Sequence, residues 1–204
     1  ATTKSNVSRD LSFLNSRRKR VKLNGLGPRS VALHGNRVYT TEYFSGSLEY
    51  FDLTDIAKWN PSLVLLGFAG DGTPEHWGEL LFHDATICFQ GWQSCSSCHP
   101  DGRADALNWD LLNDGIGNPK NTKSLLFAHQ TPPAMVSGIR ASAEIAVRSG
   151  LRYILFASRP EEEALAIDAY LKRMVKEQSF LQKCEKFSFS AERGKAIFFS
   201  LETG

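Results

Sequence analysis

The sequence predicts a mainly α-helical domain that is preceded by a small antiparallel β segment. Two observations give this fold class: apolar and polar residues alternate through much of residues 10–53, and helix-start signals with a 3.6-residue apolar period appear from Trp59 onward. A chain of 204 residues can hold one ordinary domain or two small ones. We therefore expect a β-rich segment at residues 1–58, a helical domain at 59–187 and the start of a further domain at 188–204.

The β segment is predicted from a hairpin signature. Val31 and Leu33 precede a turn at Gly35-Asn36, and an apolar run begins again at Val38. A further strand is expected at residues 48–53, because the run alternates and follows a group of turn formers. A sheet of so few strands is only marginally stable alone. We therefore expect this sheet either to pack on the domain that follows or to continue a larger sheet.

Three helices are expected in the second part of the chain. Thr73 is the expected N-cap of the first, with Pro74 in its first turn. Ser158 and Glu161 form a candidate capping box for the last, which has an apolar stripe along one face. The expected helices span residues 73–83, 141–149 and 160–178.

The most specific motif is C-x-x-C-H at residues 95–99. Two thiols at this spacing can bond to the two vinyl groups of a haem, and the histidine that follows can bind the iron. A thiol-redox motif does not need the histidine and normally follows a strand, and no strand pattern precedes Cys95. A zinc site that includes Cys88 would need a distant fourth ligand. We therefore expect one covalent haem c, attached through Cys95 and Cys98, with His99 as the proximal iron ligand.

Composition and charge argue against two kinds of partner. The net charge is +2, and the basic cluster at residues 17–20 stands alone, as expected for a solvated strand edge rather than a nucleic-acid site. No apolar run is long enough to cross a membrane. We expect neither a nucleic-acid partner nor a membrane-spanning segment.

The haem motif also predicts the compartment. In bacteria haem is attached to C-x-x-C-H after export, and residues 1–4 do not begin a hydrophobic leader. We therefore expect a processed or excised form of an exported protein, in the periplasm or outside the cell. In such an oxidising compartment Cys88 and Cys184 either pair as a disulfide or remain buried free thiols, and the sequence leaves both possibilities open.

The second axial ligand of the iron has two candidates. Residues 100–128 contain no histidine, and the first possible ligands after them are His129 and Met135. A thioether opposite histidine raises the haem potential and suits electron transfer, whereas a second histidine lowers the potential. Against both, methionine is most often a core filler and an isolated histidine is more often structural. A site with neither ligand would favour peroxide chemistry.

Other residues are candidates for contact with the haem. The turn-rich residues 100–134 are expected to wrap its edge. Arg103 and Arg140 are candidates to pair with the propionates, because guanidinium binds carboxylate bidentately, although surface arginines are commoner. Trp109 is expected in the wall of the site and could also carry electrons. The other expected wall residues are Phe82, Trp92, Leu107 and Leu125.

Three stretches of the chain resemble a known family. They are Gly78-Glu79-Leu80-Leu81-Phe82-His83-Asp84, residues 94–100, and a partial second copy at Arg193-Gly194-Lys195-Ala196-Ile197-Phe198-Phe199. Together they resemble the di-haem cytochrome c peroxidase superfamily. Residues 27–33 and 38–53 resemble a blade of a YVTN-type β-propeller. The resemblance is therefore greatest to members with a propeller upstream of the cytochrome c domain.

This resemblance implies a mainly α, cytochrome c-like haem domain, with a second haem domain in a longer polypeptide. Such enzymes use one haem to shuttle electrons and another to reduce peroxide. Glu144 falls near the position where the resemblance places the family's distal glutamate. The alternative interpretation of Glu144 is an ordinary acid in the first turn of a helix. The chain departs from the family because no second histidine follows the motif closely.

The function that the sequence favours is electron transfer by a c-type haem in an extracytoplasmic compartment. A lone haem lacks the two-centre machinery of the peroxidases, so the expected partner is a redox protein or a second haem domain. One alternative is that the chain is part of a di-haem, peroxidase-like enzyme that reduces hydrogen peroxide. A second alternative is a propeller-based surface binding module with an accessory haem.

Overall fold

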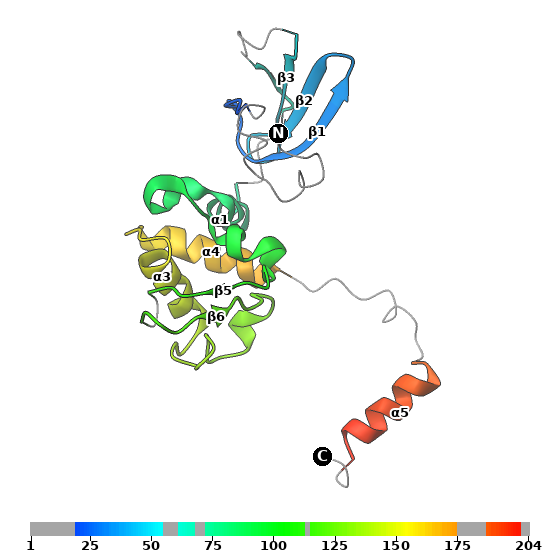
Figure 1. Ribbon diagram of the computed structural model, residues 1–204, viewed down its shortest axis with the longest axis vertical. Helices are drawn as coiled ribbons and strands as arrows, with labels where there is room; N and C mark the ends of the chain where they lie inside the picture. The colour runs from blue at the N-terminus through cyan, green and yellow to red at the C-terminus, as the bar shows by residue number, and fades with distance from the viewer. Residues whose placement is uncertain (1–18, 55–60, 68–71, 113–114, 175–186, 201–204) are drawn as a thin grey trace, which may run out of the picture.

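The computed structural model describes residues 19–54, 61–67, 72–112, 115–174 and 187–200. Within these residues a four-stranded sheet precedes a unit built around three longer helices, which are joined by turns and short strands (Figure 1). A further helix, α5 (Phe189–Phe198), follows this unit in the chain, and the hydroxyl of Ser188 accepts a hydrogen bond from the third residue after it.

The sheet is antiparallel, with the strands in the order of the chain. Its members are β1 (Pro28–His34), β2 (Arg37–Glu42), β3 (Ser47–Asp52) and β4 (Ser62–Leu65). Leu33 pairs with Val38 across the first turn, where Gly35 has a φ of 58° that glycine adopts without strain. The hairpin predicted at Gly35-Asn36 is therefore confirmed.

Helix α1 (Pro74–His83) begins at the predicted cap. The hydroxyl of Thr73 accepts a hydrogen bond from the backbone N–H of His76 at 3.2 Å, and Pro74 occupies the first turn. Gly78 faces helix α4 (Glu161–Arg173) so closely that a Cβ at this position would overlap the carbonyl of Ala166. The predicted helix at residues 73–83 is confirmed, and its glycine sets the distance between the two helices.

The start of α4 differs from the prediction. Its N-cap is Pro160, and no side chain caps the helix, so the expected capping box of Ser158 and Glu161 is wrong. The carboxylates of the first turn are used differently: Glu161 pairs with Arg148, and Glu163 pairs with Arg159. The predicted continuation of the helix over residues 175–178 lies outside the described residues.

The third longer helix, α3 (Ala143–Tyr153), begins at Ser142, whose hydroxyl accepts a hydrogen bond from Ile145 N at 3.4 Å. It packs against α4, and α4 packs against α1. The apolar core lies where these helices meet. Its buried residues are Leu81, Phe82, Ile87, Cys88, Leu151, Leu155, Ala164, Ala166, Ile167 and Leu171.

Between α1 and α3 the chain forms short elements. In order they are η4 (Ala85–Ile87), η5 (Phe89–Gly91), α2 (Cys95–Cys98), η6 (Pro100–Gly102), β5 (Asn108–Trp109), β6 (Lys120–Asn121) and η7 (Ala128–Gln130). Strands β5 and β6 pair as a two-stranded antiparallel ribbon. The prediction of a turn-rich segment at residues 100–134 is confirmed where the structure describes it.

The sheet contacts the helical unit through α1. The guanidinium of Arg29 lies 2.9 Å from a carboxylate oxygen of Glu79, and the hydroxyl of Tyr43 donates to the other oxygen at 3.3 Å. The ring of Phe44 lies 5.6 Å from that of His76, centroid to centroid. Helix α1 therefore carries the sheet on one side and contacts α4 on the other.

The expected fold class is wrong. The fold is mixed, with 38% helix and 18% strand among the described residues, and it is not clearly a mainly α cytochrome c-like domain. The reason lies in two places: the sheet is a substantial part of the chain, and much of the stretch between α1 and α3 forms turns, one-turn helices and a ribbon instead of longer helices. Among the described residues, no helix has both the length and the apolar character needed to cross a bilayer.

Candidate haem site

The three residues of the C-x-x-C-H motif line one cavity. Its volume is about 510 Å³, and its walls include Cys95, Cys98 and His99 together with residues from the β5–β6 ribbon, the η7 turn, α3 and α4. Two of the expected wall residues, Phe82 and Leu125, also line it. A concave, largely apolar cavity of this size with a few polar groups is typical of a cofactor site.

A single helical turn brings the two thiols to the same side. Ser94 is the N-cap of α2 and forms a capping box with Ser97, in which the backbone N–H of Ser94 donates to Ser97 Oγ at 3.0 Å. Residues three apart on a helix lie on one face. Both thiols are free, and burial raises the pKa of Cys95 to about 12. The motif thus presents two unpaired thiols to the cavity.

The imidazole of His99 is oriented by the backbone. Its Nδ1 lies 3.1 Å from the carbonyl oxygen of Arg103, so Nδ1–H donates to that oxygen and Nε2 keeps its lone pair. Burial lowers the pKa of His99. Hydrogen bonds with the backbone of Arg103 and Lys123 raise the pKa, but by less than burial lowers it. A neutral imidazole whose other nitrogen is held by a carbonyl is the form in which histidine binds a metal.

Trp109 lies in the wall of the cavity, as predicted, and Asp105 holds its indole. The indole Nε1–H donates to Asp105 Oδ2 at 2.8 Å, and the backbone N–H of Leu107 donates to Oδ1 at 3.0 Å. These contacts, led by the Leu107 N–H, lower the pKa of the Asp105 carboxyl. The ring of Trp109 is thereby fixed in the wall of the cavity.

Both candidates for the second iron ligand also line the cavity. Met135 follows the Pro132–Pro133 pair and has a φ of 71°. His129 is tied to α4: its Nε2 lies 2.9 Å from Asp168 Oδ1, and the two side chains are only 5% and 3% exposed. The other ring nitrogen, Nδ1, is buried and has no hydrogen-bond partner within the described parts of the chain. The structure therefore brings both candidates to the cavity that the haem motif lines.

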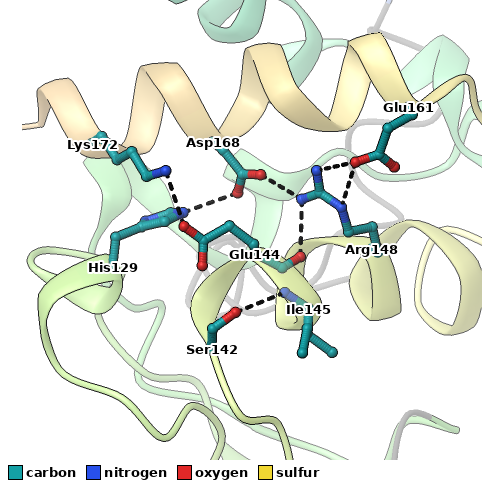
Figure 2. A network of polar contacts seen from close by, with 8 residues as sticks. All are labelled: His129, Ser142, Glu144, Ile145, Arg148, Glu161, Asp168 and Lys172. Carbon is teal, nitrogen blue, oxygen red and sulfur yellow. Dashed lines mark hydrogen bonds and ion pairs between the residues drawn. The ribbon is translucent and has the colours of Figure 1, made fainter.

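Asp168 is the centre of a polar network beside the cavity (Figure 2). It accepts hydrogen bonds from His129 and from Arg148, and Arg148 also contacts the carboxylate of Glu161 through Nε at 3.0 Å. Sequence reasoning missed both Asp168 and Arg148. The available signal was the acid at position 168 inside the apolar stripe of the last helix, where an unpaired carboxylate would be costly.

Glu144, the candidate distal acid, does not line the cavity. Its carboxylate contacts the ammonium of Lys172 on α4 (Figure 2) at 2.9 Å, and its side chain is 38% exposed. The hydrogen bond with Lys172 is the largest of the effects that lower the pKa of Glu144 to about 2. In this position Glu144 links the first turn of α3 to the end of α4.

The remaining candidates lie outside the cavity wall. Neither Arg103 nor Arg140 lines it, and the backbone carbonyl of Arg103 contributes to the site by fixing His99. Trp92 and Leu107, which were expected in the wall, are 57% and 55% exposed. Cys88 is a free, buried thiol, and Cys184 lies outside the described residues, so the possible disulfide between them stays a prediction.

The described residues contain no group of three or more His, Cys, Asp and Glu side chains that could hold a metal ion. A haem iron does not need such a group, because the porphyrin supplies four of its ligands and the protein supplies only the axial ones. The fit of the site to haem therefore depends on the cavity, the two thiols and the imidazole. All of these are present in one place.

Comparison with known proteins gives two similarities. No family model matches the chain. A segment of 58 residues, 28% of this chain, is 41% identical to hydrazine synthase subunit gamma of Kuenenia stuttgartiensis and spans 16% of that protein. This chain also aligns with a chain in the solved structure of Kuenenia stuttgartiensis hydrazine synthase pressurised with xenon. The alignment covers 63% of this chain and 45% of the hydrazine synthase chain, with a TM-score of 0.55 and 23% identity. At that identity the match shows a shared fold.

These similarities correct the family expected from the sequence. Neither comparison supports the di-haem cytochrome c peroxidase superfamily or a β-propeller. The expectation rested on the haem motif and on five- to seven-residue stretches, which any protein with a C-x-x-C-H helix and amphipathic neighbours can share. The similarity that is found joins this chain to hydrazine synthase subunit gamma over part of its length, and to the fold of a hydrazine synthase chain over a larger part.

Proposed function

We propose that this chain is a c-type haem protein that transfers electrons. The observation that carries the proposal is the cavity of about 510 Å³ that is lined at once by Cys95, Cys98 and His99. A chance C-x-x-C-H sequence has no reason to border an apolar cavity of cofactor size. When bound, the haem supplies a one-electron iron couple.

Each residue of the motif has a separate task in this proposal. Cys95 and Cys98 hold the haem by thioether bonds, for which their thiols are unpaired and on one side of α2. His99 offers Nε2 to the iron, and the carbonyl of Arg103 fixes the ring. Phe82, Leu125 and Trp109 line the cavity and would exclude water from a haem bound there, which would limit the reorganisation that accompanies a change of charge.

The second axial ligand in this proposal is Met135. Both Met135 and His129 line the cavity, but the Nε2 atom of His129 is already engaged by Asp168. Only Nδ1 of His129 is left, and its position next to the ring carbon that carries Cβ would hinder it from binding a haem iron. A thioether opposite His99 raises the potential of the couple, as electron transfer to a protein partner requires.

The setting of the protein follows from the same arguments. Hydrazine synthase subunit gamma, to which part of this chain is similar, is by its name one subunit of an enzyme. This supports a partner subunit that exchanges electrons with the haem. Attachment of haem to C-x-x-C-H after export supports an extracytoplasmic location. The division into residues 1–58, 59–187 and 188–204 is kept as the proposed organisation, with the haem in the central part.

The first experiment is a pyridine haemochrome spectrum with intact-mass analysis of protein matured through an export pathway. We expect the mass of one haem bound covalently and a sharp reduced α-band. Replacement of Cys95 and Cys98 by alanine should abolish the covalent mass. Cys88→Ala is the matched control, because Cys88 is a buried free thiol outside the cavity wall, and it should retain the haem. A wild-type protein without covalent haem would refute the proposal.

The second experiment tests the axial ligand. Oxidised wild-type protein should show the thioether-to-iron band at the far-red end of the spectrum, and Met135→Ala should lose it and bind carbon monoxide in the reduced state. His129→Gln, which leaves the thioether in place, should keep the band. If His129→Gln loses the band and Met135→Ala keeps it, the ligand assignment is wrong while the haem assignment stands.

A further inference from the structure

A second polar cluster lies far from the haem motif, on one face of the sheet. Thr40 pairs with Glu49, and Glu42 pairs with Ser47, across β2 and β3. Because side chains alternate between the two faces of a strand, these four residues lie on the same face. Glu42 and Glu49 are 1% and 0% exposed. Two acids are thus buried on neighbouring strands.

One oxygen of each carboxylate is satisfied by donors. Oε1 of Glu49 accepts from the backbone N–H groups of Asn24 and Gly25 at 2.5 and 2.7 Å. Oε2 of Glu42 accepts from the hydroxyl of Ser47 at 3.1 Å. Each glutamate thus has one side-chain oxygen that is hydrogen-bonded to the protein.

The other oxygens have no partner. Glu42 Oε1, Glu49 Oε2 and Thr40 Oγ1 are buried and form no hydrogen bond within the described residues. No ion pair with Lys or Arg is found for either glutamate in the described ranges. Two buried negative charges without a cation are costly, and each orphaned oxygen adds to that cost.

The cluster is closed over by the chain at Gly25. A Cβ at this position would lie 2.6 Å from Glu42 Cγ and 2.6 Å from Ser47 Oγ, so only a glycine backbone approaches so closely. Its own N–H points to Glu49. The cover removes bulk water, which would otherwise screen the two charges.

We propose that Glu42, Glu49 and Thr40 bind a divalent cation, Ca²⁺, through their unpartnered oxygen atoms. Carboxylate and hydroxyl oxygens are hard ligands of the kind that Ca²⁺ binds, and the ion accepts carboxylates in mono- or bidentate form in flexible geometry. The charge of the ion balances the two carboxylates. The ion joins β2 to β3, and Glu49 at the same time holds Asn24 and Gly25 through its other oxygen. Tyr43 and Phe44, which follow Glu42 in the chain, contact His76 of α1.

The experiment compares full-length, haem-loaded protein after treatment with EDTA and after addition of CaCl₂ up to about 10 mM, which covers the weaker range of calcium sites in proteins. Calorimetric titration should show one site, and the melting temperature should rise by roughly 5 °C or more at saturation. Glu42→Gln and Glu49→Gln should each weaken calcium binding at least tenfold. Thr40→Val removes one neutral ligand at constant shape and should weaken it several-fold.

Glu162→Gln is the control, because Glu162 is an exposed acid of α4, and it should bind calcium like the wild type. The proposal fails if the wild type takes up no calcium. In that case a stability that rises as the pH falls would show that the two glutamates share a proton instead. It also fails if calcium binds equally well to both glutamine variants. Titration of the wild type needs no variant, so a misfolded variant cannot hide a negative result.

Discussion

His129 and Asp168 are 39 residues apart in the sequence, yet their side chains meet at 2.9 Å and are almost completely buried. One belongs to the η7 turn and the other to α4, so the contact joins the loop wall of the cavity to the helical core. Arg148 of α3 binds the same carboxylate (Figure 2). Asp168 is therefore the residue on which three parts of the cavity wall depend.

Asp168→Ala should destabilise the protein by about 3 kcal/mol or more, because it leaves Arg148 and His129 without their buried partner. Denaturant unfolding followed by circular dichroism measures the change. Glu161→Ala is the matched control, since Glu161 pairs with the same arginine but its side chain is 61% exposed. Its cost should stay below about 1 kcal/mol, as for other exposed pairs. Equal costs for the two variants would contradict the central role of Asp168.

Gly78→Ala should disrupt the contact between α1 and α4. The added methyl group would overlap the backbone carbonyl of Ala166, which cannot move without displacing α4. We expect a loss of about 3 kcal/mol or more, at the upper end for overpacked cores, or a failure to fold. Gly194→Ala, in α5, meets nothing within 4 Å and should cause no loss of stability. Thermal melting of both variants checks the difference, and a fully stable Gly78→Ala protein would contradict the geometry.

The pair of Glu144 and Lys172 should make stability fall in acid. The pKa of Glu144 is lowered in the folded protein from 4.5 to about 2, chiefly by Lys172. A lowered folded-state pKa means that the stabilisation is fully present above pH 4.5 and is lost as the pH falls toward 2. Nuclear magnetic resonance titration of the carboxyl carbon gives the pKa directly. Lys172→Gln should return that pKa toward 4.5, and an unchanged value would refute the pairing.

Thr73→Ala should cost about 1 kcal/mol, because it removes the side-chain acceptor for the N–H of His76 at the start of α1. Thr73→Ser keeps the hydroxyl and should recover most of the loss. Unfolding by urea distinguishes the two. Equal stability of Thr73→Ala and wild type would show that the cap adds nothing to the stability of this helix.

Local signals in the sequence predicted the local structure well. The Gly35-Asn36 hairpin and the Thr73-Pro74 helix start both depend on the conformational preferences of adjacent residues, and both are present. The capping box at Ser158 failed because Arg148 and Arg159, not the backbone, engage the acids of that turn. Such competition between side chains is decided by tertiary packing, which short patterns do not encode.

The candidate site was predictable in part. The C-x-x-C-H motif identifies the side of the cavity that carries the thiols and the imidazole, because all three residues are consecutive or nearly so. The opposite wall is built from residues that are distant in the sequence, and nothing in the spacing of His129 and Asp168 indicates their contact. The fold class failed because the four-stranded sheet and the turns, one-turn helices and short ribbon between α1 and α3 take up much of the described chain.

Helix α1 contacts three neighbours through residues that lie within little more than one of its turns. Gly78 rests on α4, Glu79 holds Arg29 of the sheet, and Phe82 borders the cavity. A partner that moved the sheet would therefore act on a helix whose other residues border α4 and the cavity. The first cavity residue to be displaced would be Phe82, which belongs to that helix.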